Sequence, residues 1–132
     1  MRIMVDTNIL LSALVFSSAR MATLLERVAE DYTMVICTYI VDEFREVIAK
    51  KSPKHNAAVD AFFSKLPFEL VYTPEWQKSM PELRDEKDKP ILAAAILADV
   101  DMIITGDKDF LESNIEHPEI ISHVDFWNEY LT

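Results

Sequence analysis

Several acidic residues of this sequence follow directly on apolar segments that are typical of buried strands. Asp6 ends the apolar run 3–5, and Asp107 and Asp109 come just after the predicted strand 100–105. A short apolar run rich in β-forming residues predicts a buried strand, and in open α/β sheets ligands bind at the carboxyl ends of such strands. The sequence therefore places carboxylates, which are candidate cation ligands, at one edge of a sheet.

Two further acids stand on or beside predicted helices. Glu43 lies one turn into the predicted helix 38–51, next to its apolar stripe and not on its solvent face. Asp88 precedes the predicted helix 90–98, in the segment R-D-E-K-D-K-P. Asp85 is an alternative to Asp88, and we favour Asp88 because it is closer to the helix.

Each of these acids also has a simpler structural interpretation. Asp6 suits the N-cap of a helix, and Asp107 and Asp109 suit a tight turn with Gly106, the only glycine in the sequence. Asp88 suits a helix N-terminus, where the helix dipole stabilises a negative charge. Each interpretation is sufficient for a single acid. Together they are less convincing if the acids lie close to one another in the fold.

Parallel strands send their following loops to one edge of the sheet, so Asp6, Glu43, Asp88 and Asp107 are expected to converge. Two carboxylates about 6 Å apart repel by roughly 3 kcal/mol at an effective dielectric near 20. Four of them would approach the whole stability of a small domain, about 5–15 kcal/mol. Such a cluster persists only if it is protonated or bridged by cations. Carboxylates alone select hard ions, Mg²⁺ or Mn²⁺, and such ions promote the hydrolysis of phosphate esters.

Zinc is not expected, because the three histidines are scattered in polar segments and form no zinc-binding spacing. Asn8 also argues against an enzyme that phosphorylates its own aspartate at the first strand end, since such enzymes usually carry a second acid two residues on. A receiver domain is disfavoured because Asp6 has no acidic neighbour on the strand.

Strands alternate with helices along the whole chain, which predicts an α/β fold. We expect an α/β/α sandwich whose mostly parallel sheet is covered on both faces, formed by a single domain over residues 1–132. Thr38 is a candidate N-cap, and the segment 73–84 is expected to be a loose connection. The predicted strands are 3–5, 32–37, 68–72, 100–105 and 119–122. The predicted helices begin after Asn8 and continue at 17–31, 38–51, 58–66, 90–98, 110–114 and 124–131.

The composition is that of a globular protein with an unusual charge. Half of the 132 residues are hydrophobic, Cys37 is the single cysteine, and the formal net charge is −10. With no signal peptide or membrane-length apolar run, we expect a soluble protein of the reducing cytoplasm. The charge disfavours a nucleic-acid substrate unless the carboxylates are neutralised or basic residues gather at one place.

The sequence resembles the PIN-domain ribonucleases, the family of the VapC-type toxins of toxin–antitoxin modules, over essentially its whole length. The matching segments are V-D-T-N at 5–8, T-Y-I-V-D-E-F with Glu43, D-E-K-D-K-P-I-L-A-A-A at 85–95 and I-T-G-D-K-D-F-L at 104–111. The resemblance implies that the metal is held by Asp6, Glu43, Asp88 and Asp107. It further implies supporting roles for Asn8 and Thr105, and for Asp109 as an additional metal ligand.

By the same resemblance the sheet has five parallel strands, the protein forms a homodimer, and a small antitoxin protein silences it. The expected function is Mg²⁺-dependent endoribonuclease activity on RNA, as the toxin of a toxin–antitoxin pair. The alternative is a catalytically silent module of the same fold whose acidic face binds a basic protein partner. A calorimetric titration that shows a carboxylate-dependent Mg²⁺ site would exclude that alternative.

Overall fold

A parallel five-stranded sheet forms the centre of the protein, whose computed structural model describes residues 1–131. The strand order is β3-β2-β1-β4-β5, and every neighbouring pair is parallel. This confirms the predicted α/β fold and its five strands. Thr132, the last residue of the predicted domain, lies outside the described residues. The strands are β1 (Arg2–Val5), β2 (Thr33–Cys37), β3 (Glu69–Val71), β4 (Met102–Ile104) and β5 (Glu119–Ile121).

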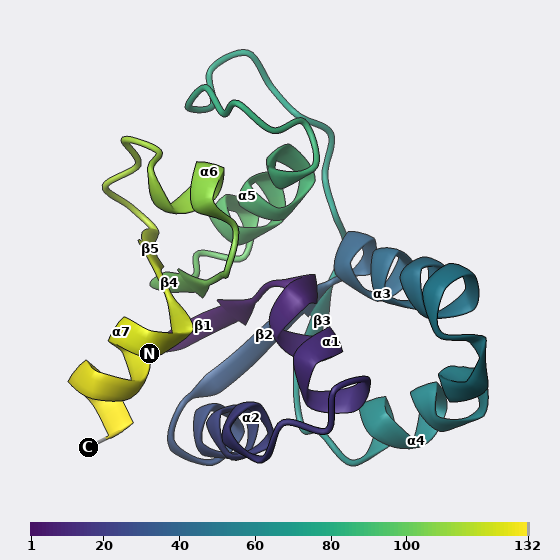
Figure 1. Ribbon diagram of the computed structural model, residues 1–132. Helices are drawn as coiled ribbons and strands as arrows, with labels where there is room; N and C mark the ends of the chain where they lie inside the picture. Colours follow the sequence, from purple (N-terminus) through teal and green to yellow (C-terminus); the bar gives the residue numbers. More distant parts are fainter. Residues whose placement is uncertain (132) are drawn as a thin grey trace.

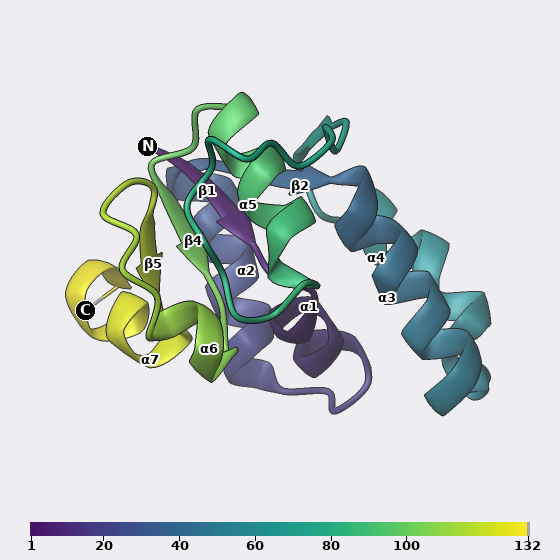
Figure 2. The same ribbon diagram turned by 90° about the horizontal axis from the view of Figure 1, so that it is seen from above.

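Helices cover both faces of this sheet. Figures 1 and 2 show α5 and α6 on one face and α2 and α7 on the other, while α3 and α4 extend beyond the β3 edge. The helices are α1 (Thr7–Leu14), α2 (Ala19–Asp31), α3 (Thr38–Lys51), α4 (Val59–Ser64), α5 (Asp88–Leu97), α6 (Lys108–Leu111) and α7 (His123–Phe126), with the 3-10 helix η1 (Pro53–Ala58) and the π-helix η2 (Trp127–Leu131). No helix among residues 1–131 combines the length and apolar character needed to cross a membrane.

The central strand β1 is deeply buried. Residues 3–5 are fully buried between β2 and β4, with Ile3 opposite Met34 on one side and Met102 on the other. A parallel strand covered on both faces has no solvent side, which explains the continuous apolar run. Cys37 is also fully buried, as its apolar neighbours predict.

The chain reverses its direction across the sheet next to β1. The first three strands follow one another toward one edge, and the chain then returns past β1 to place β4 on its other side. In open α/β sheets ligands bind at such a topological switch point, outside the carboxyl ends of the strands. Asp6 follows β1 and Asp107 follows β4, so both acids flank this point.

Some local predictions were wrong. Cys37 and not Thr38 precedes α3, and the Thr38 hydroxyl donates to the Thr73 hydroxyl, 3.1 Å away. Gly106 has no positive φ, and a Cβ built there meets no atom within 4 Å, so that turn does not require glycine. Residues 90–98 are apolar nearly all round, which predicts a buried helix; α5 is buried over 91–95, but Leu97 in its last turn is 65 % exposed.

Candidate metal centre

A cavity of about 530 Å³ opens at the carboxyl edge of the sheet, where β1, α3, α5 and the start of α6 meet. Five carboxylates line it: Asp6, Glu43, Asp85, Asp88 and Asp107. The four acids that the sequence predicted to converge therefore do lie around one cavity. Apolar side chains of α1 and α3 form another part of its wall, together with Phe16, which is 76 % exposed.

Asp6 is buried and held by a hydrogen bond to each carboxylate oxygen. The Thr7 amide donates to Oδ1 at 2.7 Å, and the Thr105 hydroxyl donates to Oδ2 at 2.6 Å. Burial raises the pKa of Asp6 to about 6, against these two hydrogen bonds, and the charges of Glu43 and Asp107 raise it further. Asp6 is thus both the predicted N-cap of α1 and an acid of the cavity whose charged form is disfavoured.

Thr105 connects Asp6 to Asp107. Its fully buried hydroxyl donates to Asp6 and accepts a hydrogen bond from the Asp107 amide at 3.0 Å. The Asp107 Oδ1 atom caps α6 by accepting from the amides of Asp109 and Phe110, at 2.9 and 3.4 Å. The second oxygen of Asp107 makes no hydrogen bond or ion pair with the described residues and remains available to a cation.

Asp85, Asp88 and Asp107 form the tightest group of acids in the cavity. Each offers one oxygen such that all three oxygens lie within 4.8 Å of one another. Asp88 and Asp85 are one turn apart, and the Asp88 amide donates to the Asp85 carbonyl at 3.1 Å. The sequence left Asp85 and Asp88 as alternatives, whereas the structure brings both of them to the same group.

Asp88 is 3 % exposed, and its Oδ2 atom is buried with no hydrogen-bond partner among the described residues. Burial is the main cause that raises the pKa of Asp88 to about 8, followed by the charges of Asp107 and Asp6. A buried carboxylate oxygen without a partner is costly, because it has lost its hydration and gained nothing in return. This cost identifies Asp88 as a group that needs a proton or a cation.

Glu43 reaches the cavity from α3 and is held by Tyr39, one helical turn earlier. The Tyr39 hydroxyl donates to Glu43 Oε2 at 3.3 Å. Burial and the Glu43 charge raise the pKa of Tyr39 to about 12, so the hydroxyl keeps its proton for this bond. The spacing of four residues explains the contact, since side chains at i and i+4 are neighbours on a helix.

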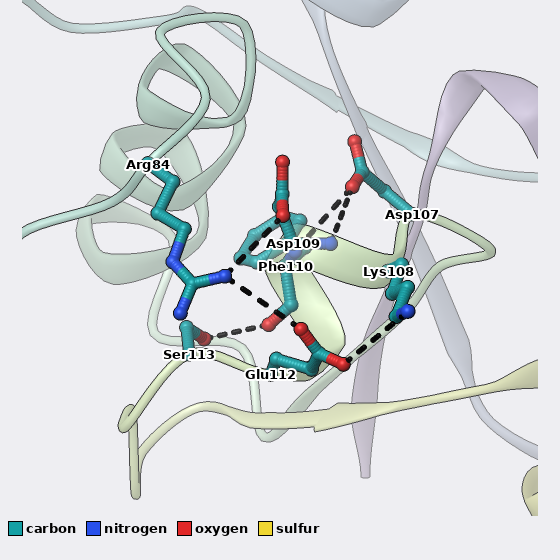
Figure 3. Close-up of polar contacts among 7 residues, drawn as sticks. All are labelled: Arg84, Asp107, Lys108, Asp109, Phe110, Glu112 and Ser113. Carbon is teal, nitrogen blue, oxygen red and sulfur yellow. Dashed lines mark hydrogen bonds and ion pairs between the residues drawn. The ribbon is translucent and has the colours of Figure 1, made fainter.

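Asp109 lies outside this cavity. Figure 3 shows its carboxylate directed toward Arg84, which stands 3.7 Å from both Asp109 and Glu112. Asp109 also lines a separate cavity of about 340 Å³. Asn8 lines the acidic cavity as an exposed residue, and Thr7 presents there a buried hydroxyl with no partner among residues 1–131.

The residues of the acidic cavity fit a hard divalent cation. In the octahedral shell of a Mg²⁺ ion, opposite oxygens lie about 4.2 Å apart and adjacent ones about 3 Å. The three oxygens of Asp85, Asp88 and Asp107 lie within 4.8 Å of one another, so they could share an ion once their side chains move closer together. The donors are all carboxylates, which excludes a soft-metal preference. A cation would also satisfy the unpartnered oxygen of Asp88 and compensate the repulsion in the cavity.

A family model described as PIN domain matches residues 2–109, a stretch that contains all five cavity acids. The chain belongs to the PIN domain family. The match confirms the resemblance to the PIN-domain family that the sequence motifs indicate. A comparison with the curated proteins gave no match.

Solved structures of toxin–antitoxin PIN proteins share the fold. VapBC2 from Rickettsia felis, bound to a promoter DNA fragment, aligns with a TM-score of 0.68 and 19 % identity, over 92 % of this chain and 97 % of the other. FitAB bound to the IR36 DNA fragment aligns with a TM-score of 0.59 and 15 % identity, over 91 % of this chain and 94 % of the other. VapC20 of Mycobacterium tuberculosis, a toxin that cleaves the sarcin-ricin loop, aligns with a TM-score of 0.56 and 12 % identity, over 81 % of this chain and 91 % of the other. At these identities the likeness shows the fold.

Proposed function

We propose that this PIN domain is a Mg²⁺- or Mn²⁺-dependent endoribonuclease and the toxin component of a cytoplasmic toxin–antitoxin pair. The observation that carries the proposal is the group of Asp85, Asp88 and Asp107, with its buried and unpartnered carboxylate oxygen. A structural protein gains nothing from such a group, whereas a metal-dependent hydrolase needs it.

The proposed metal set is Asp6, Glu43, Asp88 and Asp107, joined by Asp85. When bound, Mg²⁺ supplies a Lewis acid for the scissile phosphate and lowers the pKa of an attacking water. The chain's own contribution is to hold its ligands in place. Thr105 fixes Asp6 and Asp107 relative to each other, and Tyr39 fixes Glu43.

The structural relatives support the choice of substrate and partner. VapC20 is described as a toxin that cleaves the sarcin-ricin loop, which is RNA, and VapBC2 and FitAB are complexes captured on DNA. We therefore propose RNA as the substrate and a small antitoxin as the partner of this chain. A homodimer is part of the same proposal, and Asn8 is proposed to support the site at the cavity mouth.

The test is cleavage of several structured RNAs by the purified protein with Mg²⁺, with Mn²⁺ and with a chelator. Asp88→Asn and Asp107→Asn remove one ligand each at nearly constant volume. We expect a loss of roughly 100-fold or more, because even the hydrogen-bond partners of metal ligands contribute 10- to 100-fold. Glu26→Gln is the matched control, since Glu26 is exposed on α2 and has no ion pair in the described part of the chain.

The same experiment separates the nuclease from an acidic protein-binding module. The net charge of −10 is the observation that favours such a module. A binding module predicts no Mg²⁺ binding in calorimetry and no cleavage beyond that of Asp88→Asn. Cleavage that continues unchanged in both variants would exclude the carboxylate group as the catalytic centre.

A further inference from the structure

Most of the positive charges of this acidic protein already have a carboxylate partner. Seven of its 13 lysines and arginines form ion pairs: Arg2, Arg27, Arg45, Lys50, Arg84, Lys89 and Lys108. Six form none among residues 1–131: Arg20, Lys51, Lys54, Lys65, Lys78 and Lys87. Arg20 lies over the ring of Trp127, 4.6 Å from its centroid, which leaves five lysines.

Two of those five lysines, Lys51 and Lys87, line cavities of the described structure. Both of them line the acidic cavity and also a second cavity of about 580 Å³ beside it. The two cavities share Glu43 and Val47 as well, so they adjoin along α3. The unpaired lysines thus stand at the boundary between the metal centre and a second cavity of similar size.

The backbone amide of Lys87 donates to Asp85 Oδ1 at 3.0 Å, but its side chain forms no ion pair among residues 1–131. Lys87 immediately precedes α5, at the helix end where the dipole disfavours a cation. Lys51 lies at the C-terminal end of α3, where the helix dipole favours a cation. Its neighbour Lys50 pairs with Glu46 at 3.8 Å, whereas Lys51 forms no ion pair among residues 1–131. Five carboxylates line the acidic cavity, yet neither ammonium group forms an ion pair with any of them. Both charges therefore remain available to an external anion.

We propose that the second cavity is a subsite for a nucleotide that flanks the scissile bond, with Lys51 and Lys87 holding the adjacent phosphates of a single RNA strand. Its volume lies within the range of sites for ligands of nucleotide size. Thr38, Tyr39 and Val47 provide walls for the ribose and base. Three carboxylates, Asp42, Glu43 and Glu46, also line this cavity, and its three lysines balance their charge. In a protein of net charge −10 this lining is therefore locally neutral, and Lys51 and Lys87, which have no carboxylate partner, remain free to bind phosphates. The inference rests on the proposed nuclease function and deepens it.

The experiment measures binding of a fluorescein-labelled single-stranded RNA of mixed sequence, by anisotropy at several salt concentrations. Asp88→Asn serves as the parent protein so that the strand is not cut. Lys51→Gln, Lys87→Gln and the double variant are compared with Lys54→Gln and Lys78→Gln, which remove unpaired lysines that line neither the acidic cavity nor the second cavity.

Each phosphate contact to a single strand contributes about 0.7 to the slope of log affinity against log salt. The double variant should therefore lower the slope by roughly 1.4 and weaken binding about ten-fold near physiological salt. The control variants should change both quantities far less. Circular dichroism confirms that each variant is folded.

Equal losses in the control variants would overturn the inference, because binding would then follow diffuse charge. Unchanged binding in the double variant would overturn it as well, and so would a parent that binds no RNA. Cleavage by the wild-type protein, measured separately, distinguishes these failures from failure of the nuclease function: RNA that is cut with no dependence on the two lysines leaves the function standing and removes the subsite.

Discussion

Replacing Asp88 by asparagine should stabilise the metal-free protein at neutral and alkaline pH. The Asp88 pKa is about 8 in the folded protein, against an ordinary value of 3.8. Between these values the folded protein keeps a proton that the unfolded chain has released, so stability falls as the pH rises through this window. The asparagine side chain of the Asp88→Asn variant carries no charge at any of these pH values and would avoid the loss.

The magnitude follows from the width of the window. Raising the pH from about 5 to about 8 crosses three pKa units, and at 1.36 kcal/mol each this gives about 4 kcal/mol. The cavity is open to water, which screens the neighbouring charges, so we expect about half of that value, about 2 kcal/mol. This remains a large part of the 5–15 kcal/mol that stabilises an ordinary domain.

Urea unfolding in a chelator, near pH 5 and near pH 8, measures the difference. Wild type should lose about 2 kcal/mol more than Asp88→Asn over this interval. The Glu26→Gln control should follow wild type, because Glu26 is an exposed acid. Parallel pH profiles for wild type and Asp88→Asn would refute the reasoning that Asp88 is an uncompensated buried acid.

Magnesium gives a second readout in the same assay. A ligand present at about 100 times its dissociation constant stabilises the folded state by about 2.7 kcal/mol. Mg²⁺ should therefore recover the stability of wild type near pH 8 and have a much smaller effect on Asp88→Asn. If Mg²⁺ stabilised the two proteins equally, Asp88 would not be a ligand.

Two further predictions concern residues that position the site. Thr105→Val leaves the Asp6 oxygen and the Asp107 amide without their hydroxyl partner, so unfolding experiments should show a loss of about 1–3 kcal/mol, and Thr105→Ser should restore most of it. Arg84→Gln should weaken Mg²⁺ binding in calorimetry by roughly two- to five-fold, because its exposed pairs with α6 hold the neighbouring Asp85 near Asp107. An increase in affinity would instead show that Arg84 acts only as a repelling charge.

The parts of the site that the sequence predicted are those attached to regular elements. Asp6 follows a strand whose apolar run is unambiguous, and Glu43 keeps its place beside the apolar stripe of α3. A parallel sheet then brings such residues to one edge without any knowledge of side-chain contacts. The Tyr39–Glu43 contact could have been found in the same way, from its spacing of four residues.

The parts of the site that the sequence left open or did not predict lie on the segment 72–87, which forms no helix or strand. Such a segment has no periodicity, so nothing in the sequence tells which of its side chains face the cavity. Asp85 enters the metal group from this segment, and Arg84 forms ion pairs with Asp109 and Glu112 (Figure 3). Only the tertiary fold decides which partners the side chains of Asp85 and Arg84 meet.

Capping and metal binding turn out to be compatible interpretations of the same acids. A carboxylate has two oxygens, and a helix cap occupies one of them. Asp107 caps α6 through Oδ1 alone, so its other oxygen keeps its full capacity for a cation, in a side chain that lies beside Asp85 and Asp88. The cap also orients that second oxygen, since it fixes the side chain against the backbone. Whether such an acid can bind a metal therefore depends on the oxygen that the cap does not occupy. A turn or cap assignment for a strand-end aspartate is no argument against a role in the site.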